Sequence, residues 1–255
     1  MLLAIDIGNT LIDFGLFKGD DLLAVYKAAT KPIRSEDEYK NVFENAFKSA
    51  NVSKKDIEEI IISCVVPSLT QPFIRLAKAI LGRAPLLVGP GLSSGLLLRV
   101  DNPLEVGSDL VADAIGGKSL YGKNLFICDL GTASKYLYLD NDGAFAGLAI
   151  APGFRLSIEA LVEGAASLPE VTLIPPKNVM GKNTLDCMNS GITYGSAYEA
   201  KGFFEAFQKE ANRPLKAILT GGNAHYISSL LPEFSFEPNL LLIGLKEIAK
   251  RRHHK

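Results

Sequence analysis

Cysteine is scarce in this sequence, and the three that occur, Cys64, Cys128 and Cys187, are widely spaced. Their number and spacing exclude a disulfide framework and a cysteine-based zinc site, and they predict a reducing compartment. Charge of one sign is not in surplus either, since the formal net charge is −1. Such a balance gives no electrostatic reason to expect nucleic acid or a membrane surface as a partner.

Long apolar runs are also missing. Asp6 interrupts the first apolar segment at once, so the start does not read as a signal peptide. No stretch approaches the roughly 20 apolar residues of a membrane span. We therefore expect a cytoplasmic protein with no membrane partner and no nucleic-acid partner.

Two common phosphate-binding motifs are absent as well. The chain has no Gly-x-x-x-x-Gly-Lys-[Ser/Thr] loop and no Gly-x-Gly-x-x-Gly sequence. A kinase built on this chain would therefore be neither a P-loop enzyme nor a protein kinase. What the chain does have is 255 residues with 47% apolar content, enough for one large core or two smaller ones.

The segment Asp6–Thr10 follows the short apolar run of residues 2–5 and precedes residues 11–17, and both flanking runs read as strands. Gly8 lets the backbone of the connecting turn approach a ligand closely. A carboxylate at the end of a buried strand needs a partner or a metal. The pattern predicts a hairpin that holds a phosphate, with Asp6 helping to anchor a magnesium ion.

The same pattern returns at Asp129–Ala133, again after an apolar strand. Two hairpins of one design suggest a duplicated fold. The alternative is that each Asp-x-Gly is an ordinary tight turn. A single copy would favour that alternative, whereas two copies favour a nucleotide site.

The remaining pattern predicts an α/β protein of two ribonuclease H-like (actin-like ATPase) domains with a nucleotide cleft between them. The boundary is expected near Gly116-Gly117, giving domains 1–116 and 117–255, and the last helix can pack back on the first domain. Expected strands are residues 2–7, 11–17, 21–29, 60–66, 85–88, 125–130, 135–139, 144–150 and 215–219. Expected helices are residues 35–50, 69–81, 105–121, 156–166, 184–209 (one or two helices), 224–230 and 240–252, with loops at 89–103 and 168–183.

Two further segments can carry chemistry. Gly107-Ser108-Asp109 brings a carboxylate onto the start of a helix beside a Gly/Pro-rich loop, where it can accept a proton from a substrate hydroxyl. Spacing alone favours a solvated or capping Asp. Thr220–Asn223 puts two glycines at a strand end, which admits a nucleotide base or ribose; a plain turn is nearly as good an interpretation.

With these residues in view, the chain resembles the type III pantothenate kinase family of the acetate kinase/sugar kinase/Hsp70/actin superfamily. The resemblance covers nearly the whole chain. It is carried by ordered segments at 6–10, 63–68, 101–107, 129–133, 149–153, 168–169, 181–184, 190–192 and 220–222.

The resemblance implies an ATP-dependent phosphorylation of pantothenate to 4′-phosphopantothenate, the first step of coenzyme A biosynthesis, by a homodimer. It implies Asp109 as general base, Gly107 and Thr184 as pantothenate contacts, and Asp129 as the ligand of a monovalent cation, K⁺ or NH₄⁺. Asp6 would also serve Mg²⁺ through the phosphates. The ATP contacts implied are Asp6, Ile7, Gly8, Asn9, Thr10, Leu11, Ile12, Asp13 and Thr132.

The chain departs from the family pattern in its substrate segments. Leu110 stands where the family has an Arg that holds the pantothenate carboxylate, and Val100 stands where it usually has a Tyr. Asp113 replaces a later Asn, and Ser134-Lys135 replaces a common Thr-Thr. Arg99 or Lys135 is a candidate substitute cation for the carboxylate.

These departures leave alternatives open. One is a non-catalytic nucleotide-binding or transcription-accessory paralogue, and another is a kinase for a different small alcohol. Retention of Asp109 favours the two kinase interpretations, whereas loss of the Arg and the Tyr favours an altered substrate or no catalysis.

Overall fold

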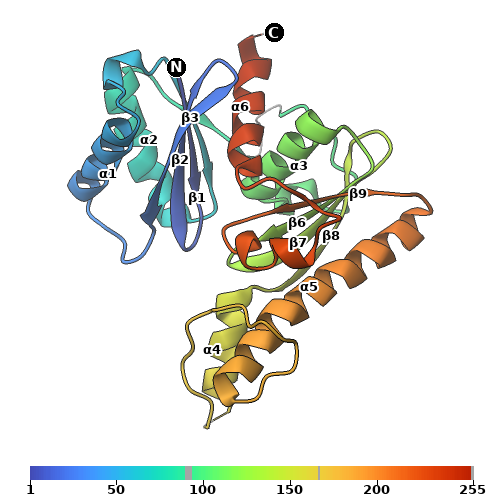
Figure 1. The fold of residues 1–255 in the computed structure, drawn as a ribbon. Coiled ribbons are helices and arrows are strands. Elements are labelled where there is room, and N and C mark those ends of the chain that lie inside the picture. Colours follow the sequence, from blue (N-terminus) through green and yellow to red (C-terminus); the bar gives the residue numbers. More distant parts are fainter. Residues whose placement is uncertain (90–93, 166, 254–255) are drawn as a thin grey trace. The chain divides into compact units, whose positions relative to one another are not determined.

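The computed structural model describes residues 1–89, 94–165 and 167–253, and Figure 1 shows its ribbon. The chain divides into two compact units. The first comprises Met1–Leu96, Asp101–Ser119 and the segment that begins at Leu240, and the second comprises Leu97–Val100 and Leu120–Asn239. The first unit thus runs slightly past the expected boundary at residue 116 and includes the last helix.

The first unit is built on a sheet of order β3-β2-β1-β4-β5. Strands β1 (Leu2–Ile7), β2 (Leu11–Lys18) and β3 (Asp21–Ala29) form an antiparallel meander. Strands β4 (Glu59–Cys64) and β5 (Leu86–Leu87) add to it in parallel. All five lie where the sequence predicts strands, because each is an apolar run with clear turn residues at its ends.

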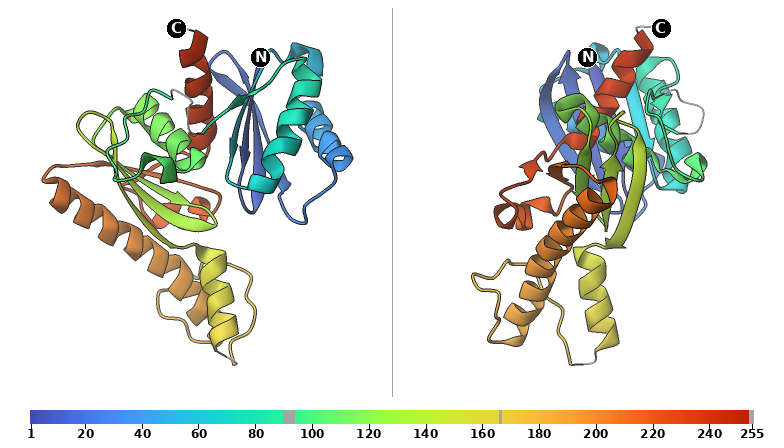
Figure 2. Two further views of the ribbon diagram at one scale, coloured as in Figure 1. Left: turned by 180° about the vertical axis from the view of Figure 1, so that it is seen from behind. Right: turned by 90° about the vertical axis from the view of Figure 1, so that its right-hand side faces the viewer.

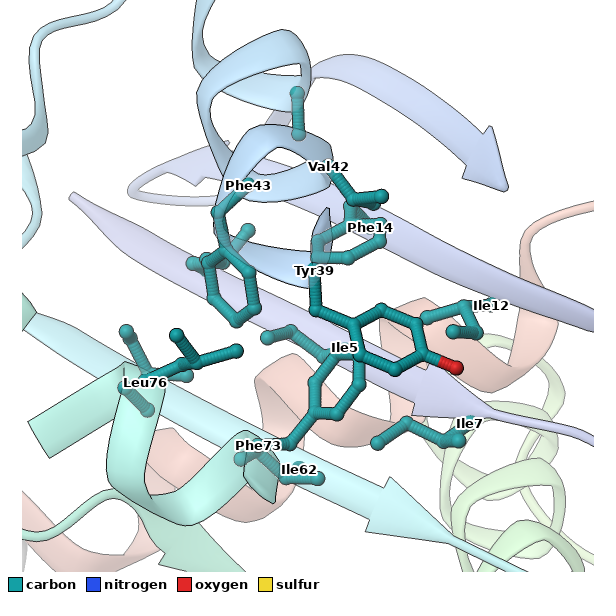
Figure 3. Close-up of a cluster of buried hydrophobic side chains, with 14 of the residues drawn as sticks. Ile5, Ile7, Ile12, Phe14, Tyr39, Val42, Phe43, Ile62, Phe73 and Leu76 are labelled. Carbon is teal, nitrogen blue, oxygen red and sulfur yellow. The ribbon is translucent and has the colours of Figure 1, made fainter. Parts of the chain in front are cut away.

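Four helices cover the two faces of this sheet: α1 (Glu36–Ser49), α2 (Pro67–Leu81), α3 (Ser108–Tyr121) and α6 (Leu240–His253). The core against α1 and α2 contains Ile5, Phe14, Tyr39, Phe43 and Phe73, as Figure 3 shows. Residues of the opposite face, such as Ala4 and Ile61, pack against α3 and α6. Ser35 and Glu38 form a capping box at the start of α1, which fixes where the helix begins.

The second unit repeats this topology, with strand order β10-β9-β6-β7-β8. Strands β6 (Leu125–Leu130), β7 (Ala133–Leu139) and β8 (Phe145–Pro152) form the antiparallel meander. Strands β9 (Lys216–Thr220) and β10 (Ser235–Phe236) are parallel additions. Each strand of the first sheet therefore has a counterpart in the second, as the paired Asp-x-Gly segments predict.

Helices α4 (Phe154–Gly164) and α5 (Thr184–Ala211) complete the second unit. The aromatic and small residues of α5, among them Ala200 and Phe204, pack on Phe126 and Cys128. Figure 2 shows that α5 runs along the sheet and continues beyond it, with α4 beside its N-terminal part. We refer to α4, the N-terminal part of α5 and the connection between them as the arm.

The structure corrects several element bounds. Residues 184–211 form one helix, uninterrupted at Gly191 and Gly195, and residues 224–230 hold two short 3₁₀ turns in place of a helix. Helix α3 starts at Ser108, later than predicted, after a 3₁₀ turn at Pro103–Glu105. Parts of the predicted loop 89–103 and the end of the predicted helix 156–166 lie outside the described residues.

Candidate functional site

The first Asp-x-Gly turn joins β1 to β2 and is fixed by backbone hydrogen bonds. The Gly8 amide donates to the Leu11 carbonyl at 3.0 Å, and the Thr30 hydroxyl donates to the Gly8 carbonyl at 2.7 Å. Thr30 is buried at the end of β3. Asn9, Thr10 and Leu11 are exposed at the tip, whereas Ile12 returns to the core. The turn is therefore held rigidly while its polar tip stays accessible, as a phosphate-binding turn requires.

Two carboxylates lie opposite each other below this turn. Asp6 on β1 and Asp13 on β2 are direct cross-strand partners, and like charges in that position repel. Lys27 on β3 pairs with Asp13 at 2.6 Å, which offsets one of the two charges. A magnesium ion bound beside Asp6 would be a further positive charge at this pair.

This donor set suits magnesium. Mg²⁺ prefers oxygen ligands and is commonly held by one or two carboxylates together with substrate phosphates. Within the described ranges no group of three or more His, Cys, Asp or Glu side chains is placed to hold a metal on its own. A magnesium ion at Asp6 would therefore need phosphate oxygens to complete its shell, which fits the predicted role.

A pair of serines joins this end of the first sheet to the start of α3. Ser63 on β4 is the parallel-strand partner of Asp6. Its hydroxyl lies 3.0 Å from the hydroxyl of Ser108, which also accepts a hydrogen bond from the Cys64 amide at 3.2 Å. Both serines are buried. They bring the first residue of α3 to the strand end that carries Asp6.

Asp109, the predicted general base, follows Ser108 directly and is partly exposed. Its Oδ1 accepts a hydrogen bond from the Leu110 amide at 2.9 Å. A Cβ on Gly107 would lie 2.5 Å from the same oxygen. Gly107 is therefore the residue that allows this carboxylate to sit over the helix start, which places two of the predicted site residues together.

The second Asp-x-Gly turn joins β6 to β7 and is held by Asn223. The backbone N–H of Asn223 donates to the Leu130 carbonyl, and the side-chain Nδ2 of Asn223 donates to the Gly131 carbonyl, both at 3.0 Å. Gly221 has a φ of +94° and leaves no room for a Cβ next to Asp129. The predicted segment Thr220–Asn223 thus packs against the turn that contains Thr132 and is hydrogen-bonded to it.

Asp129, the predicted ligand of a monovalent cation, has a charged neighbour that the sequence interpretation did not assign to it. The Lys135 Nζ lies 2.5 Å from the Asp129 Oδ2, with side chains only 16% and 9% exposed, respectively. An ammonium group therefore stands where potassium was expected to bind. Potassium binding at Asp129 stays a prediction. The ion pair with Lys135 argues against it.

The residues at which this chain departs from the family's substrate segments are mostly buried or paired. Arg99, one candidate for a replacement cation, donates to Asp140 and, at 2.6 Å, to Asp142. These two bonds hold the pKa of Arg99 above its ordinary value. Leu110 is buried on α3, Asp113 is buried one turn later, and Val100 is half-buried. Arg99 and Lys135 are thus both paired with carboxylates of the protein.

Thr184, the predicted pantothenate contact, begins α5 and is exposed. Asn183 caps the helix by accepting from the Asp186 amide at 2.9 Å. Figure 1 shows this end of α5 within the arm, away from the sheet that carries Asp129 and Thr132. Within the second unit, the structure does not bring Thr184 together with the other predicted residues.

A cavity of about 460 Å³ opens in the second unit between α4 and the residues that follow β9. Its aromatic and apolar lining includes Phe154, Ile158 and Tyr226, and Asn223 contributes an amide. Acidic side chains from Glu159, Glu163 and Glu170 also line it. Gly153 and Gly221-Gly222, which border this cavity, stood out in the sequence. The sequence pattern did not predict that residues of α4 line a cavity.

Comparisons with known proteins agree on one family. A family model described as type III pantothenate kinase matches residues 2–206. A relative from Exiguobacterium named type III pantothenate kinase is 36% identical over 98% of this chain and 99% of its own length. A relative of the same name from Listeria monocytogenes is 36% identical over 98% of this chain and 97% of its own length.

Solved structures share the fold at low sequence identity. A Campylobacter jejuni protein assigned to the Baf family of transcriptional activators aligns with a TM-score of 0.61 and 17% identity, covering 99% of this chain and 100% of its own. Component A of the (R)-2-hydroxyglutaryl-CoA dehydratase of Acidaminococcus fermentans aligns with a TM-score of 0.59 and 15% identity, covering 100% and 99%. These likenesses confirm the predicted two-domain actin-like fold, but at this identity they say nothing about the function of this chain.

Proposed function

Because this chain belongs to the type III pantothenate kinase family, we propose that it transfers the γ-phosphoryl group of ATP to the 4′-hydroxyl of pantothenate. This reaction makes 4′-phosphopantothenate, the first step of coenzyme A biosynthesis. The match to the relatives extends over nearly the whole of this chain and nearly the whole of theirs. The likeness to a Baf family protein does not favour a regulatory role, because that fold is shared with proteins of other names.

The hydrogen bond between Ser63 and Ser108 carries the proposal most directly. It anchors the start of α3 to the strand end that bears Asp6. A phosphoryl acceptor needs a base beside the transferred group, and positioning is most of the catalysis in such reactions. Asp109 follows Ser108, so we assign to it the proton of the substrate hydroxyl.

The first turn would hold the phosphates. The exposed tip residues Asn9, Thr10 and Leu11 can reach a ligand directly. The full set of proposed ATP contacts is Asp6, Ile7, Gly8, Asn9, Thr10, Leu11, Ile12 and Asp13. A magnesium ion beside Asp6 supplies neutralisation of phosphate charge when bound. The hydroxyl oxygen then forms its bond to the γ-phosphorus, ADP leaves, and the Asp109 carboxylate takes the proton.

The second turn would hold the rest of the nucleotide. Thr132 lies beside the cavity, because Gly153, which precedes Phe154, packs so closely on the Thr132 carbonyl that no Cβ fits. Apolar walls with a few polar groups are typical of sites for flat organic ligands. We propose that the base of ATP occupies this cavity. Ile158→Trp would fill it and should weaken ATP binding measured by calorimetry; unchanged affinity would place the base elsewhere.

A homodimer would explain the position of Thr184. The arm exposes large apolar side chains, and patches of this kind mark interaction sites. They include Leu156, Leu161, Ile174, Val179, Met180 and Leu185. We infer that the arm pairs with a second copy and that Thr184 serves a substrate site completed by that copy, together with Gly107. Sedimentation of the purified protein tests this, and a monomer at micromolar concentration would contradict it.

We place the enzyme in the cytoplasm. All three cysteines are free thiols, as a reducing compartment maintains them. None of the described helices combines the length and the apolar character that a membrane crossing needs. Fractionation of source cells tests this placement, and recovery of the protein outside the cytoplasmic fraction would contradict it.

The activity itself is tested by incubating the protein with ATP, magnesium and pantothenate. We expect ADP release that depends on pantothenate, and a phosphorylated product of the matching mass. ATP consumption that is equal with and without pantothenate would contradict the proposal. Pantetheine and simple sugars serve as comparison alcohols, and a clear preference for one of them would indicate a different acceptor.

A further inference from the structure

The charge beside Asp129 comes from within the chain. Lys135 lies on β7 directly opposite Asp129 on β6 in the antiparallel register. Cross-strand partners point to the same face of a sheet, and here their charged ends meet at 2.5 Å. The carboxylate oxygen that a free cation would use already has an ammonium as its neighbour.

Both members of the pair are shielded from solvent. The Asp129 side chain is 9% exposed and that of Lys135 is 16% exposed. A buried carboxylate without a counter-charge is much more costly than one that is paired. The pair therefore satisfies by itself the requirement that a bound potassium ion would otherwise meet.

The neighbouring residues leave little space for a second cation on the Asp129 carboxylate. Gly221 packs so tightly on Oδ1 that even a Cβ would collide with it, and Oδ2 carries the ammonium. Proteins hold potassium by replacing its water shell with several oxygens at once. A short neutral side chain at position 135 would leave room for such an ion, whereas the long lysine fills it.

The counterpart position in the first sheet shows the contrast. There the cross-strand partner of Asp6 is Asp13, a second carboxylate, and the lysine lies one strand further out, at Lys27. The cross-strand pair at the first turn thus consists of two carboxylates, whereas the pair at the second turn consists of a carboxylate and an ammonium. The second turn has its positive charge built in.

We propose that the Lys135 ammonium takes the place of the monovalent cation at Asp129, so that this enzyme works without potassium or ammonium ions. The inference rests on the proposed kinase activity. Lys135 acts as a positioning residue: it keeps the carboxylate of Asp129 in place below the Gly131–Thr132 turn.

The test compares the parent with Lys135→Thr and Lys135→Met. Pantothenate-dependent ADP formation is measured from no added potassium up to about 0.1 M KCl, with choline chloride keeping the ionic strength constant. The parent should vary by less than about twofold across the series. Lys135→Thr, which leaves space and an oxygen, should lose at least about tenfold without potassium and recover with KCl or NH₄Cl. Lys135→Met fills the space without a charge, so salt should not restore it.

A second readout does not depend on activity. The melting temperature of Lys135→Thr should rise with KCl more than with choline chloride, because an ion that binds only the folded state stabilises it. The parent should show no such difference. Lys201→Thr removes an exposed ion pair with Glu233 in the same unit and should leave both readouts as in the parent.

Several results would overturn the inference. One is a parent enzyme that requires potassium or ammonium. A second is a Lys135→Thr variant that is fully active without either ion, and a third is a folded Lys135→Thr variant that neither ion restores. A parent that never phosphorylates pantothenate in any salt would instead refute the proposed function, so the two failures are distinguishable.

Discussion

Gly244 of α6 packs directly against the carbonyl oxygen of Ala112 on α3, and a Cβ at Gly244 would collide with that oxygen. Gly116 makes the reciprocal approach to the Leu240 carbonyl. The two helices therefore meet backbone to backbone. This contact ties the last helix to α3, the helix whose first turn carries Asp109.

We predict that Gly244→Ala lowers the free energy of unfolding by about 1–3 kcal/mol, because the added methyl group must push two backbones apart. Urea denaturation of the purified variant measures the change. Gly202→Ala is the matched control. Gly202 lies in α5 with open space around it, so the same substitution should stabilise the protein by about 1 kcal/mol through helix propensity. Equal effects at both positions would contradict the packing argument.

Asp109→Asn should keep the fold and reduce kcat by about 10²–10⁴-fold, the usual loss when a general base is removed. The Asn side chain can still accept the hydrogen bond that the Leu110 amide now donates to Asp109. Steady-state kinetics with saturating ATP measure the effect, and the melting curve checks the fold. Turnover within a few-fold of the parent would show that another group takes the proton.

Gly8→Val should weaken ATP binding by at least about tenfold, because a branched side chain stands between the turn backbone and a phosphate. A Cβ there would lie 3.1 Å from the Leu11 carbonyl oxygen, so we also expect a small loss of stability, below that of Gly244→Ala. Calorimetric titration with a non-hydrolysable ATP analogue measures the affinity. If the affinity were unchanged, the nucleotide would lie away from this turn.

The enzyme should discriminate little between pantothenate and panthenol, the analogue in which an alcohol replaces the carboxylate. Leu110 is apolar and buried, and the two candidate replacement cations, Arg99 and Lys135, are paired with Asp140 and Asp129. A charge-assisted contact to the carboxylate is worth about 1.5–3 kcal/mol, or roughly one to two powers of ten. We therefore expect the two kcat/KM values to agree within about tenfold.

The double variant Val100→Tyr with Leu110→Arg extends this comparison. It should raise the preference for pantothenate, mainly through KM, if the contact is equally strong in the ground and transition states. Because Leu110 is only 6% exposed, a melting curve must accompany the kinetics. A parent that already prefers pantothenate by a hundredfold or more would mean that another cation serves the carboxylate.

Local sequence patterns predicted most of the fold. The two meanders follow from alternating apolar runs and Asp-x-Gly turns, and the start of α1 follows from the capping pair Ser35 and Glu38. Strand β10 at Ser235–Phe236 was missed because two residues carry no periodic signal. Helix α5 continues through Gly191 because a glycine inside a helix costs only about 1 kcal/mol and does not by itself end the helix.

The candidate site was predicted only in part. The turn residues and Asp109 were visible as motifs, but the bond between Ser63 and Ser108 joins residues far apart in sequence, and no local pattern reveals it. The pairing of Lys135 with Asp129 had a usable signal. In a hairpin, residues equally distant from the turn lie opposite each other, and these two flank the Gly131–Ala133 segment in that way.

Phosphorylation of pantothenate with ATP is best tested by mass spectrometry of the product, with the parent and Asp109→Asn proteins at equal concentration. We expect 4′-phosphopantothenate from the parent, formed in proportion to ADP, and almost none from the variant. ADP release by the parent without phosphopantothenate, or equal product from both proteins, would contradict it.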